Sequence, residues 1–205
     1  MLGLPVAIEL HKQLPKKLIY ERFSLNASEK NAIDRDISKI TIVHEISPAR
    51  VKIAEGKKVK AIFILLVHLK RKDFLEKTII CVSKIIPQNF VMVLEYEDKA
   101  CLGVYYKKLY LTSWQKTENL VLHLQGLDFD ALWDNMIVQI SGITIEQGNT
   151  LDEQIVLYEQ QKKLTKEIEK LEKRIQAENQ PKKKFALVQE KRELERTLQE
   201  HGLQY

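Results

Sequence analysis

Short apolar runs separated by turn residues fill the first 149 positions, and the longest run predicts the centre of a sheet. Six apolar residues in succession, 62–67, precede His68 and the cations at 70–72. An unbroken apolar run bounded by turn signals is typical of a strand that is buried on both faces. We therefore expect residues 59–70 to form a central strand.

Hydrophobic periodicity predicts three helices and further strands around this segment. The helices are expected at 27–38, 73–86 and 128–141, and the strands at 39–47, 89–96, 100–108, 109–114 and 119–126. The connection after residue 47 offers Val51 and Ile53 as candidates for a strand extension. The order of the elements favours one mixed α/β sheet domain over residues 1–149.

Polar residues at the starts of the three helices predict their caps. Ser24 or Asn26 is available before the first helix. Asp73, with Glu76 three positions later, forms a capping box for the second helix, and Asp128 caps the third. The third helix should face the core with the apolar residues that recur at spacings of four, Leu132, Met136 and Ile140.

Residues 150–205 form a second predicted domain, a helical hairpin. Their segment 151–200 has no glycine and is rich in Glu, Lys, Gln and Arg. Its apolar residues follow the steps of a heptad seam, and Gln180–Pro181 interrupts the helix, so two helices should fold back as an antiparallel, coiled-coil-like pair. Because this seam is narrow, we expect the hairpin to dock a protein partner through Leu157, Leu164, Ile168, Leu171, Ile175, Leu187, Leu194 and Leu198.

Composition narrows the class of protein but not its activity. The 205 residues carry 33 Lys and Arg against 28 Asp and Glu, a formal charge of +5, which is mildly basic. The two cysteines, Cys81 and Cys101, lie in apolar segments and are expected to be buried free thiols. The first residues lack the pattern of a signal peptide, and no apolar run reaches the ~18 residues of a membrane span, so we expect a cytoplasmic protein.

The end of the central strand raises the question of a nuclease site. Many metal-dependent nucleases place an acid-x-lysine pair at the end of such a strand, where carboxylates hold Mg²⁺ and the lysine stabilises developing charge. Here His68 stands in the place of the acid, two positions before Lys70, and imidazole is a poor Mg²⁺ ligand. Glu45 is a lone upstream acid. The weak catalytic candidates are therefore Glu45, His68 and Lys70, and the alternatives are a simple strand end and a degenerate nuclease fold.

Other chemistry has little support in the sequence. The five histidines, His11, His44, His68, His123 and His201, show no HxH or HExxH spacing. A zinc site assembled across strands from His44, His68 and His123 is the alternative to ordinary, partly buried histidines. No GxxxxGK[ST], GxGxxG or GxSxG motif is present. We predict no cofactor and no metal.

Three basic clusters are candidates for contact with phosphate. Salt would weaken such contacts, and the alternative for each cluster is a solvated surface. An aromatic stretch beside cations, residues 103–114, could also stack on bases, although aromatic residues are ordinary fillers of strands. The nucleic-acid-binding candidates are Lys16, Lys17, Lys70, Arg71, Lys72, Lys182, Lys183 and Lys184.

The sequence resembles a known family over nearly its whole length. The resemblance is carried by segments in order, among them LPKKLIYERF, KITIVHEISPARVKI, KTIICVSKIIPQNFVMVLEY, LQGLDFDALWDNMIVQISG and AENQPKKK. Together they resemble the prokaryotic domain-of-unknown-function family 4391. This resemblance implies no assigned activity and supplies no catalytic residues. It implies a genomic association with SNF2-like helicases and DNA methyltransferases, and an acid two places before Lys70, from which this sequence departs at His68.

These observations favour a non-enzymatic accessory subunit. We expect a mixed-sheet domain with basic clusters and a hairpin that docks a helicase or DNA methyltransferase in a DNA-processing or defence complex. A divergent metal-dependent nuclease is the first alternative. A self-assembling structural protein that uses the hairpin as a homodimer seam is the second.

Overall fold

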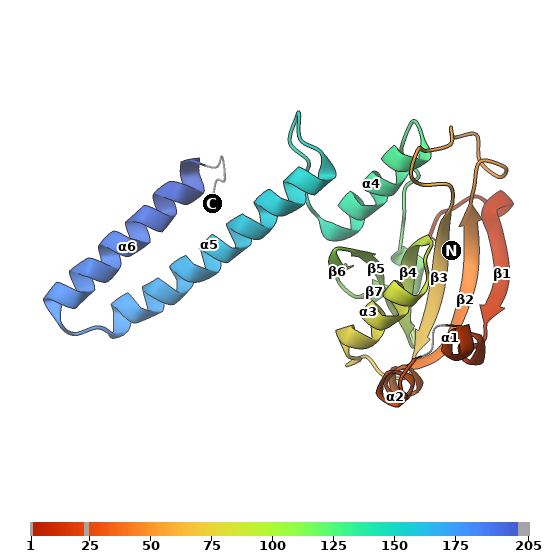
Figure 1. Cartoon of the computed structure of the whole chain (residues 1–205), viewed down its shortest axis with the longest axis horizontal. Helices are drawn as coiled ribbons and strands as arrows, with labels where there is room; N and C mark the ends of the chain where they lie inside the picture. The colour runs from red at the N-terminus through yellow and green to blue at the C-terminus, as the bar shows by residue number, and fades with distance from the viewer. Residues whose placement is uncertain (1, 23–24, 201–205) are drawn as a thin grey trace. The chain divides into compact units, whose positions relative to one another are not determined.

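The computed structural model describes residues 2–22 and 25–200 (Figure 1). The chain divides into two compact units, Met1–Gly142 and Ile143–Tyr205. The first unit contains a mixed sheet with helices, and the second contains two long helices that pair with each other. The predicted fold class, a mixed-sheet domain followed by a helical hairpin, is confirmed.

The first unit is built on a seven-stranded sheet within the described residues. The strands are β1 Glu9–Leu14, β2 Ile37–Ile46, β3 Ile62–Leu69, β4 Asn89–Tyr96, β5 Lys99–Tyr106, β6 Lys108–Leu111 and β7 Gln115–Lys116. They lie in the order β1-β2-β3-β4-β5-β6, with β7 pairing beside β5. Only β3 and β4 run parallel among these pairs, and helix α3, Glu76–Ile85, connects them.

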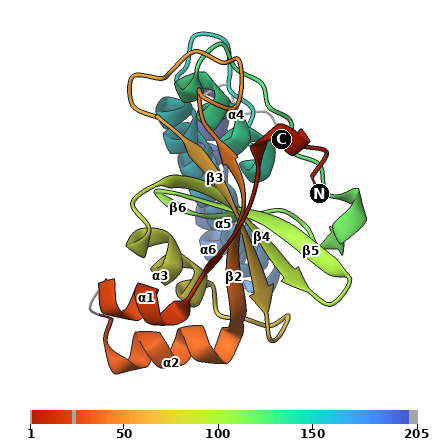
Figure 2. The ribbon, with the colours of Figure 1, turned by 90° about the vertical axis from the view of Figure 1, so that its right-hand side faces the viewer.

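Helices of the first unit cover the sheet. They are α1 Lys16–Arg22, α2 Ala27–Asp36, α3 Glu76–Ile85 and α4 Phe129–Ser141, with 3₁₀ turns at Val6–Ile8 and Thr117–Asn119. Helices α1, α2 and α3 lie together on one face of the sheet (Figure 2). Ile33, Ile79, Leu65 and Met92 belong to the apolar cluster between these helices and the strands, and each such burial contributes about 1.5–3 kcal/mol.

The central strand is confirmed at β3, which pairs with β2 on one side and β4 on the other. In contrast, β1 and α1 were not predicted. The sequence of β1, ELHKQL, is mostly polar because β1 is an edge strand whose side chains are largely exposed. Such a strand has no periodic apolar signal to read.

The strand expected at 119–126 and the candidate extension at Val51 and Ile53 are both wrong. Residues 51–52 are bends and residue 53 is irregular, and residues 120–126 belong to no strand. The second segment buries Leu120 and Leu122, which explains its strand-like pattern. Its backbone at His123 is instead satisfied by the Gln139 side-chain amide of α4, through two hydrogen bonds of 2.9 Å.

The helix caps agree with the sequence in two of three cases. Asn26 and Asp128 cap α2 and α4 by accepting from backbone N–H groups. The capping box predicted at Asp73 is wrong, because α3 begins at Glu76 with Leu75 as its N-cap, and the Asp73 carboxylate accepts from Arg71 instead. Ser24, the other candidate cap of α2, lies outside the described residues.

A loop before β3 is held by a carboxylate from α4. The backbone N–H groups of Lys57, Lys58 and Val59 all donate to the Asp130 carboxylate, with a shortest distance of 2.8 Å. Gly56 makes this approach feasible, because a Cβ there would lie 2.5 Å from Asp130 Oδ1. The start of the central strand is therefore tied to α4.

The second unit consists of α5 Leu151–Ala177 and α6 Pro181–Glu200. A capping box of Thr150 and Glu153 begins α5, and Pro181 stands at the first position of α6, where a missing N–H costs nothing. At 1.5 Å per residue, α5 is about 40 Å long. The two helices enclose a small apolar cluster of Ile168 and Leu198 with Leu164 and Leu194.

Candidate functional site

The carboxyl ends of the parallel strands bring His68 together with a carboxylate. His68 on β3 lies beside Glu95 on β4 in the parallel register. The two side chains form an ion-pair contact of 2.7 Å between His68 Nδ1 and Glu95 Oε2. His68 remains 37% exposed. A carboxylate at this distance orients an imidazole and sets its tautomer, which is the arrangement that a general base requires.

Lys70 is committed to the end of α2. Its side-chain ammonium donates to the backbone carbonyl of Asp34 at 2.6 Å, and its backbone N–H donates to the backbone carbonyl of Asp36 at 2.8 Å. Cations near the last carbonyls of a helix satisfy free acceptors and interact favourably with the helix dipole. Lys70 therefore fastens β3 to α2.

Glu45 does not join His68 and Lys70. Because β2 runs antiparallel to β3, Glu45 lies opposite Phe63, at the other end of the central strand. His68 lies five positions after Phe63 along the strand, a distance of about 16 Å. Glu45 pairs instead with Arg50 at 3.4 Å.

Two basic positions that were predicted separately converge on Asp34. Lys16 of α1 donates to the Asp34 carboxylate at 3.0 Å, and Lys70 donates to the carbonyl of the same residue. Tyr20 also donates to the carboxylate at 2.8 Å, and this bond, followed by the bond from Lys16, lowers the pKa of Asp34. Burial and the neighbouring Asp34 raise the pKa of Tyr20. Lys16 thus serves the packing of α1 on α2.

Asp36 is the most buried carboxylate of this region, with 1% of its surface exposed. Arg35 donates to it twice, at 2.7 and 2.8 Å, Thr78 Oγ1 donates at 2.7 Å and the Leu75 N–H at 3.2 Å. The bonds from Arg35 are the main reason that the pKa of Asp36 is held far below its usual range, despite burial. Asp36 therefore links the end of α2 to the start of α3.

Asp34, Asp36 and Glu95 were missed as members of this region. Glu95 has a sequence signal, because it ends an apolar strand as His68 does, but its meaning depends on the parallel register. Across the part of the chain that the structure describes, no three His, Cys, Asp or Glu side chains group in a way that could hold a metal ion. The arrangement can orient one histidine, but it offers no carboxylate pair for Mg²⁺.

The remaining basic candidates are mostly paired within the protein. Lys17 lies 3.7 Å from Glu21, and Arg71 donates to Asp73. Lys72 stands over the ring of Trp114 at 5.8 Å. The cations of the second unit, Lys182, Lys183 and Lys184, are exposed in the first turn of α6. To bind phosphate, Lys17, Arg71 and Lys72 would therefore have to give up their internal partners, whereas the three lysines of α6 are exposed.

The aromatic stretch is also engaged internally. Lysines stand over the rings of Tyr105, Tyr106 and Tyr110 at 5.8, 5.8 and 4.8 Å. Tyr110 is buried. Base stacking on these rings remains a prediction, and it would require the lysines to move aside.

The histidines of the zinc hypothesis lie apart. His44 is opposite Ile64 on β3, four residues before His68 along that strand, and His123 lies in the extended segment beside α4. His44 is buried, and neither of its ring nitrogens has a hydrogen-bond partner among the residues that the structure describes. Burial lowers the pKa of His44. His201 lies outside the described residues.

The partner-binding candidates of the hairpin divide into buried and partly buried residues. Ile168, Leu171 and Leu198 are buried, and the other five predicted seam residues are only partly buried. Lys191, the odd residue of the seam, bridges Glu172 at 2.7 Å and Glu195 at 3.2 Å. The partly buried seam residues are Leu157, Leu164, Ile175, Leu187 and Leu194.

Comparisons with known proteins identify a family but no activity. A search of the curated proteins and a search of the solved structures give no match to this chain. No helix of the described residues is long and apolar enough to cross a membrane. A family model, described as a domain of unknown function (DUF4391), matches residues 2–198. The chain, which resembled this family in its sequence segments, belongs to it.

Proposed function

We propose that the protein is a non-enzymatic accessory subunit that docks a protein partner through its helical hairpin. The observation that carries the proposal is the incomplete burial of the hairpin. In these two helices of 27 and 20 residues, three of the eight predicted seam residues are buried, Ile168, Leu171 and Leu198, and the other five are only partly buried. Helical stability in water depends mainly on the packing of an apolar face, so such a pair gains from a further surface.

Exposed apolar side chains extend the same argument. Val156 on α5 is 49% exposed and Phe185 on α6 is 66% exposed. Large aromatic residues are enriched at the centres of protein interfaces, where they contribute more than their neighbours. Phe185 is therefore the expected anchor of the docking surface.

The charges of the hairpin favour a protein over a nucleic acid. After residue 150 the chain has 12 Lys and Arg against 11 Asp and Glu, a balance of +1. Acidic side chains spread along both helices would repel a phosphate backbone. The partner class, a helicase or a DNA methyltransferase of a DNA-processing or defence complex, rests on the family resemblance.

The test is affinity purification of the tagged protein from its host, with and without nuclease, read by mass spectrometry. We expect a protein partner that survives nuclease treatment and is lost with Phe185→Glu. The matched control is Lys183→Glu, a neighbouring exposed position, which should retain the partner. Circular dichroism should show unchanged helix content in both variants. Capture that is lost on nuclease treatment, or that is unchanged in Phe185→Glu, would overturn the proposal.

The same experiment separates the self-assembly alternative. A second copy of this chain as the occupant of the hairpin surface would give a dimer in light scattering, and Phe185→Glu would dissociate it. A monomer in solution that binds a different protein supports the accessory role.

A divergent nuclease is the second candidate, because His68 and Glu95 form an oriented pair at the ends of parallel strands. It predicts DNA cleavage that depends on Mg²⁺ or Mn²⁺ and is lost in Glu95→Gln. Lys70→Ala is the weaker test, because Lys70 also fastens α2. Undiminished cleavage in Glu95→Gln, or none in the wild type, would exclude this pair as a nuclease site.

A further inference from the structure

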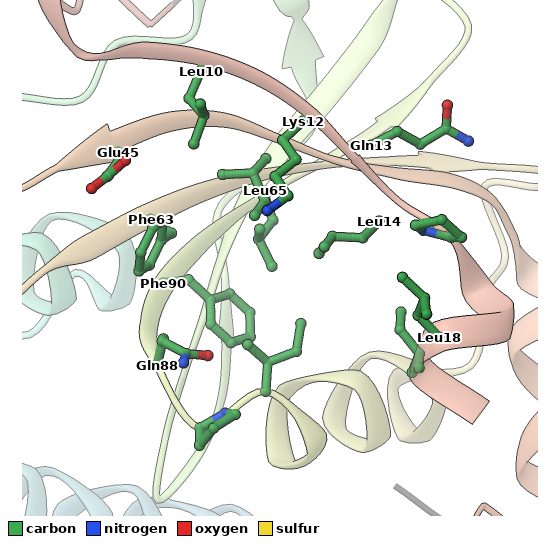
Figure 3. A pocket seen from close by; sticks show the side chains of 15 residues that line it. Leu10, Lys12, Gln13, Leu14, Leu18, Glu45, Phe63, Leu65, Gln88 and Phe90 are labelled. Carbon is green, nitrogen blue, oxygen red and sulfur yellow. The ribbon is translucent and has the colours of Figure 1, made fainter. Parts of the chain in front are cut away.

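An apolar cavity of about 490 Å³ lies on the helix-covered face of the sheet, at the end opposite His68 (Figure 3). Phe63, Leu65 and Phe90 line it from β3 and β4. Leu14 and Leu18 line it from β1 and α1, and the connection from α3 to β4 closes the other side. This volume is within the range of small-molecule sites, about 300–1,000 Å³, and its lining is mainly apolar as theirs is.

One cation lies at the rim of this apolar space. The side chain of Lys12 on β1 is exposed to solvent and reaches toward the cavity (Figure 3). Within residues 2–22 and 25–200, its ammonium has no ion-pair or hydrogen-bond partner. The one carboxylate of the lining, Glu45, is already paired with Arg50 at 3.4 Å. The cavity therefore combines apolar walls with a single unbalanced positive charge.

We infer that this cavity binds a small amphipathic monoanion, a molecule with an apolar chain or ring system and one carboxylate. The apolar part is removed from water against Phe63, Leu65 and Phe90, which favours binding in proportion to the area buried. The carboxylate accepts a charge-assisted hydrogen bond from Lys12. An amine with the same chain meets like charge, and a neutral alcohol leaves the ammonium unpaired.

The shape of the cavity favours a compact ligand. Helix α1 and residues 86–88 stand on either side of the opening, with strands beneath. A macromolecular helix needs a continuous groove, whereas a single chain or ring fits between these walls. The polar groups at the rim, Lys12 and Gln88, are suited to one head group.

The test measures binding of decanoate to the full-length protein by isothermal titration calorimetry. Decanol and decylamine, which have the same chain and different head groups, are the comparison ligands. We expect saturable binding of decanoate and none of decylamine. Lys12→Gln should weaken decanoate about five- to tenfold, the effect of one charge-assisted contact, and leave decanol unchanged. The control Lys17→Gln, a lysine that does not line the cavity, should bind as the wild type does.

A filling variant locates the site. Leu14→Trp places a larger side chain in the cavity and should abolish binding of both decanoate and decanol. Leu18→Trp is the second filling variant, because Leu18 is exposed enough for the larger ring to leave the fold intact. No saturable binding at millimolar decanoate, equal binding of decylamine, or binding that ignores Lys12→Gln or both filling variants would overturn the inference.

Discussion

Removing the buried carboxylate of Asp36 should destabilise the first unit strongly. In Asp36→Ala, the buried Thr78 hydroxyl loses its acceptor, which costs about 1–3 kcal/mol, and the part-buried Leu75 N–H loses a hydrogen bond of about 0.5–1.5 kcal/mol. Arg35 is 45% exposed and can turn to water, so its part is small, about 0–1 kcal/mol. The expected total is about 1.5–5.5 kcal/mol.

Asp36→Asn should cost less, because its amide oxygen still accepts from Thr78 and Leu75 while the pair with Arg35 is lost. We expect about 1–2 kcal/mol for this change. For a chain of this size, 1 kcal/mol lowers the Tm by about 2–4 °C. The two tryptophans, Trp114 and Trp133, both lie in the first unit, so their fluorescence during urea unfolding measures the effect.

The control is Asp98→Asn, which makes the same chemical change at an exposed turn between β4 and β5. It should leave the free energy of unfolding nearly unchanged. Equal losses for Asp36→Ala and Asp36→Asn would refute the reasoning, because they would show that the two retained hydrogen bonds contribute nothing. A loss in Asp36→Ala no larger than in Asp98→Asn would refute it as well.

The stabilising contribution of the Asp36 carboxylate should also depend on pH in the acid range. The folded-state pKa of Asp36 is depressed below the value near 3.9 of the unfolded chain, so its contribution is fully present above that pH and is lost as the pH falls toward the folded-state pKa. The wild type should lose stability over this acid range more steeply than Asp36→Asn, as measured by urea unfolding. Parallel acid limbs for the two proteins would contradict this assignment.

Three further predictions follow from single sites. Burial depresses the pKa of His44, so protonation below about pH 6.5 favours the unfolded chain. His44→Leu should therefore reduce the loss of stability as the pH falls below this value. An unchanged dependence of the unfolding free energy on pH, measured by urea unfolding, would contradict this. Gly56→Ala should destabilise the protein by about 1–3 kcal/mol, because its Cβ would clash with Asp130; an unchanged Tm would contradict this. Cys81, which is half-buried, should react with Ellman's reagent before Cys101, whose pKa burial raises to about 12; equal rates in the folded protein would contradict this.

Strong periodicity made the central strand, α4 and the hairpin predictable from sequence. Each has an apolar pattern long enough to identify both its type and its buried face. The edge strand β1 lacked such a pattern, and the segment 120–126 had one without being a strand, because a side chain of α4 supplies its hydrogen bonds. An alternating apolar pattern predicts which side chains are buried, but it does not predict which groups form hydrogen bonds with the backbone.

The polar region at the end of β3 could be predicted only in part. His68 and Lys70 stood out by position, but their partners come from distant segments. The Leu75 N–H, just before α3, donates to the Asp36 carboxylate 39 residues earlier in the chain, whereas the local rule selected Asp73 as a cap. Glu95 becomes the partner of His68 only once β3 and β4 are known to be parallel. Long-range contacts of this kind leave no fixed spacing in the sequence.

The bond between Asp130 and the loop before β3 bears on the order in which the protein is synthesised. Every strand of the sheet ends before residue 117, yet the acceptor for the backbone of residues 57–59 follows in α4. A nascent chain that has just left the ribosome with all seven strands would still have an unanchored start to its central strand. Domains generally fold as units during synthesis, so the first unit should complete its fold only when α4 emerges, immediately ahead of the hairpin.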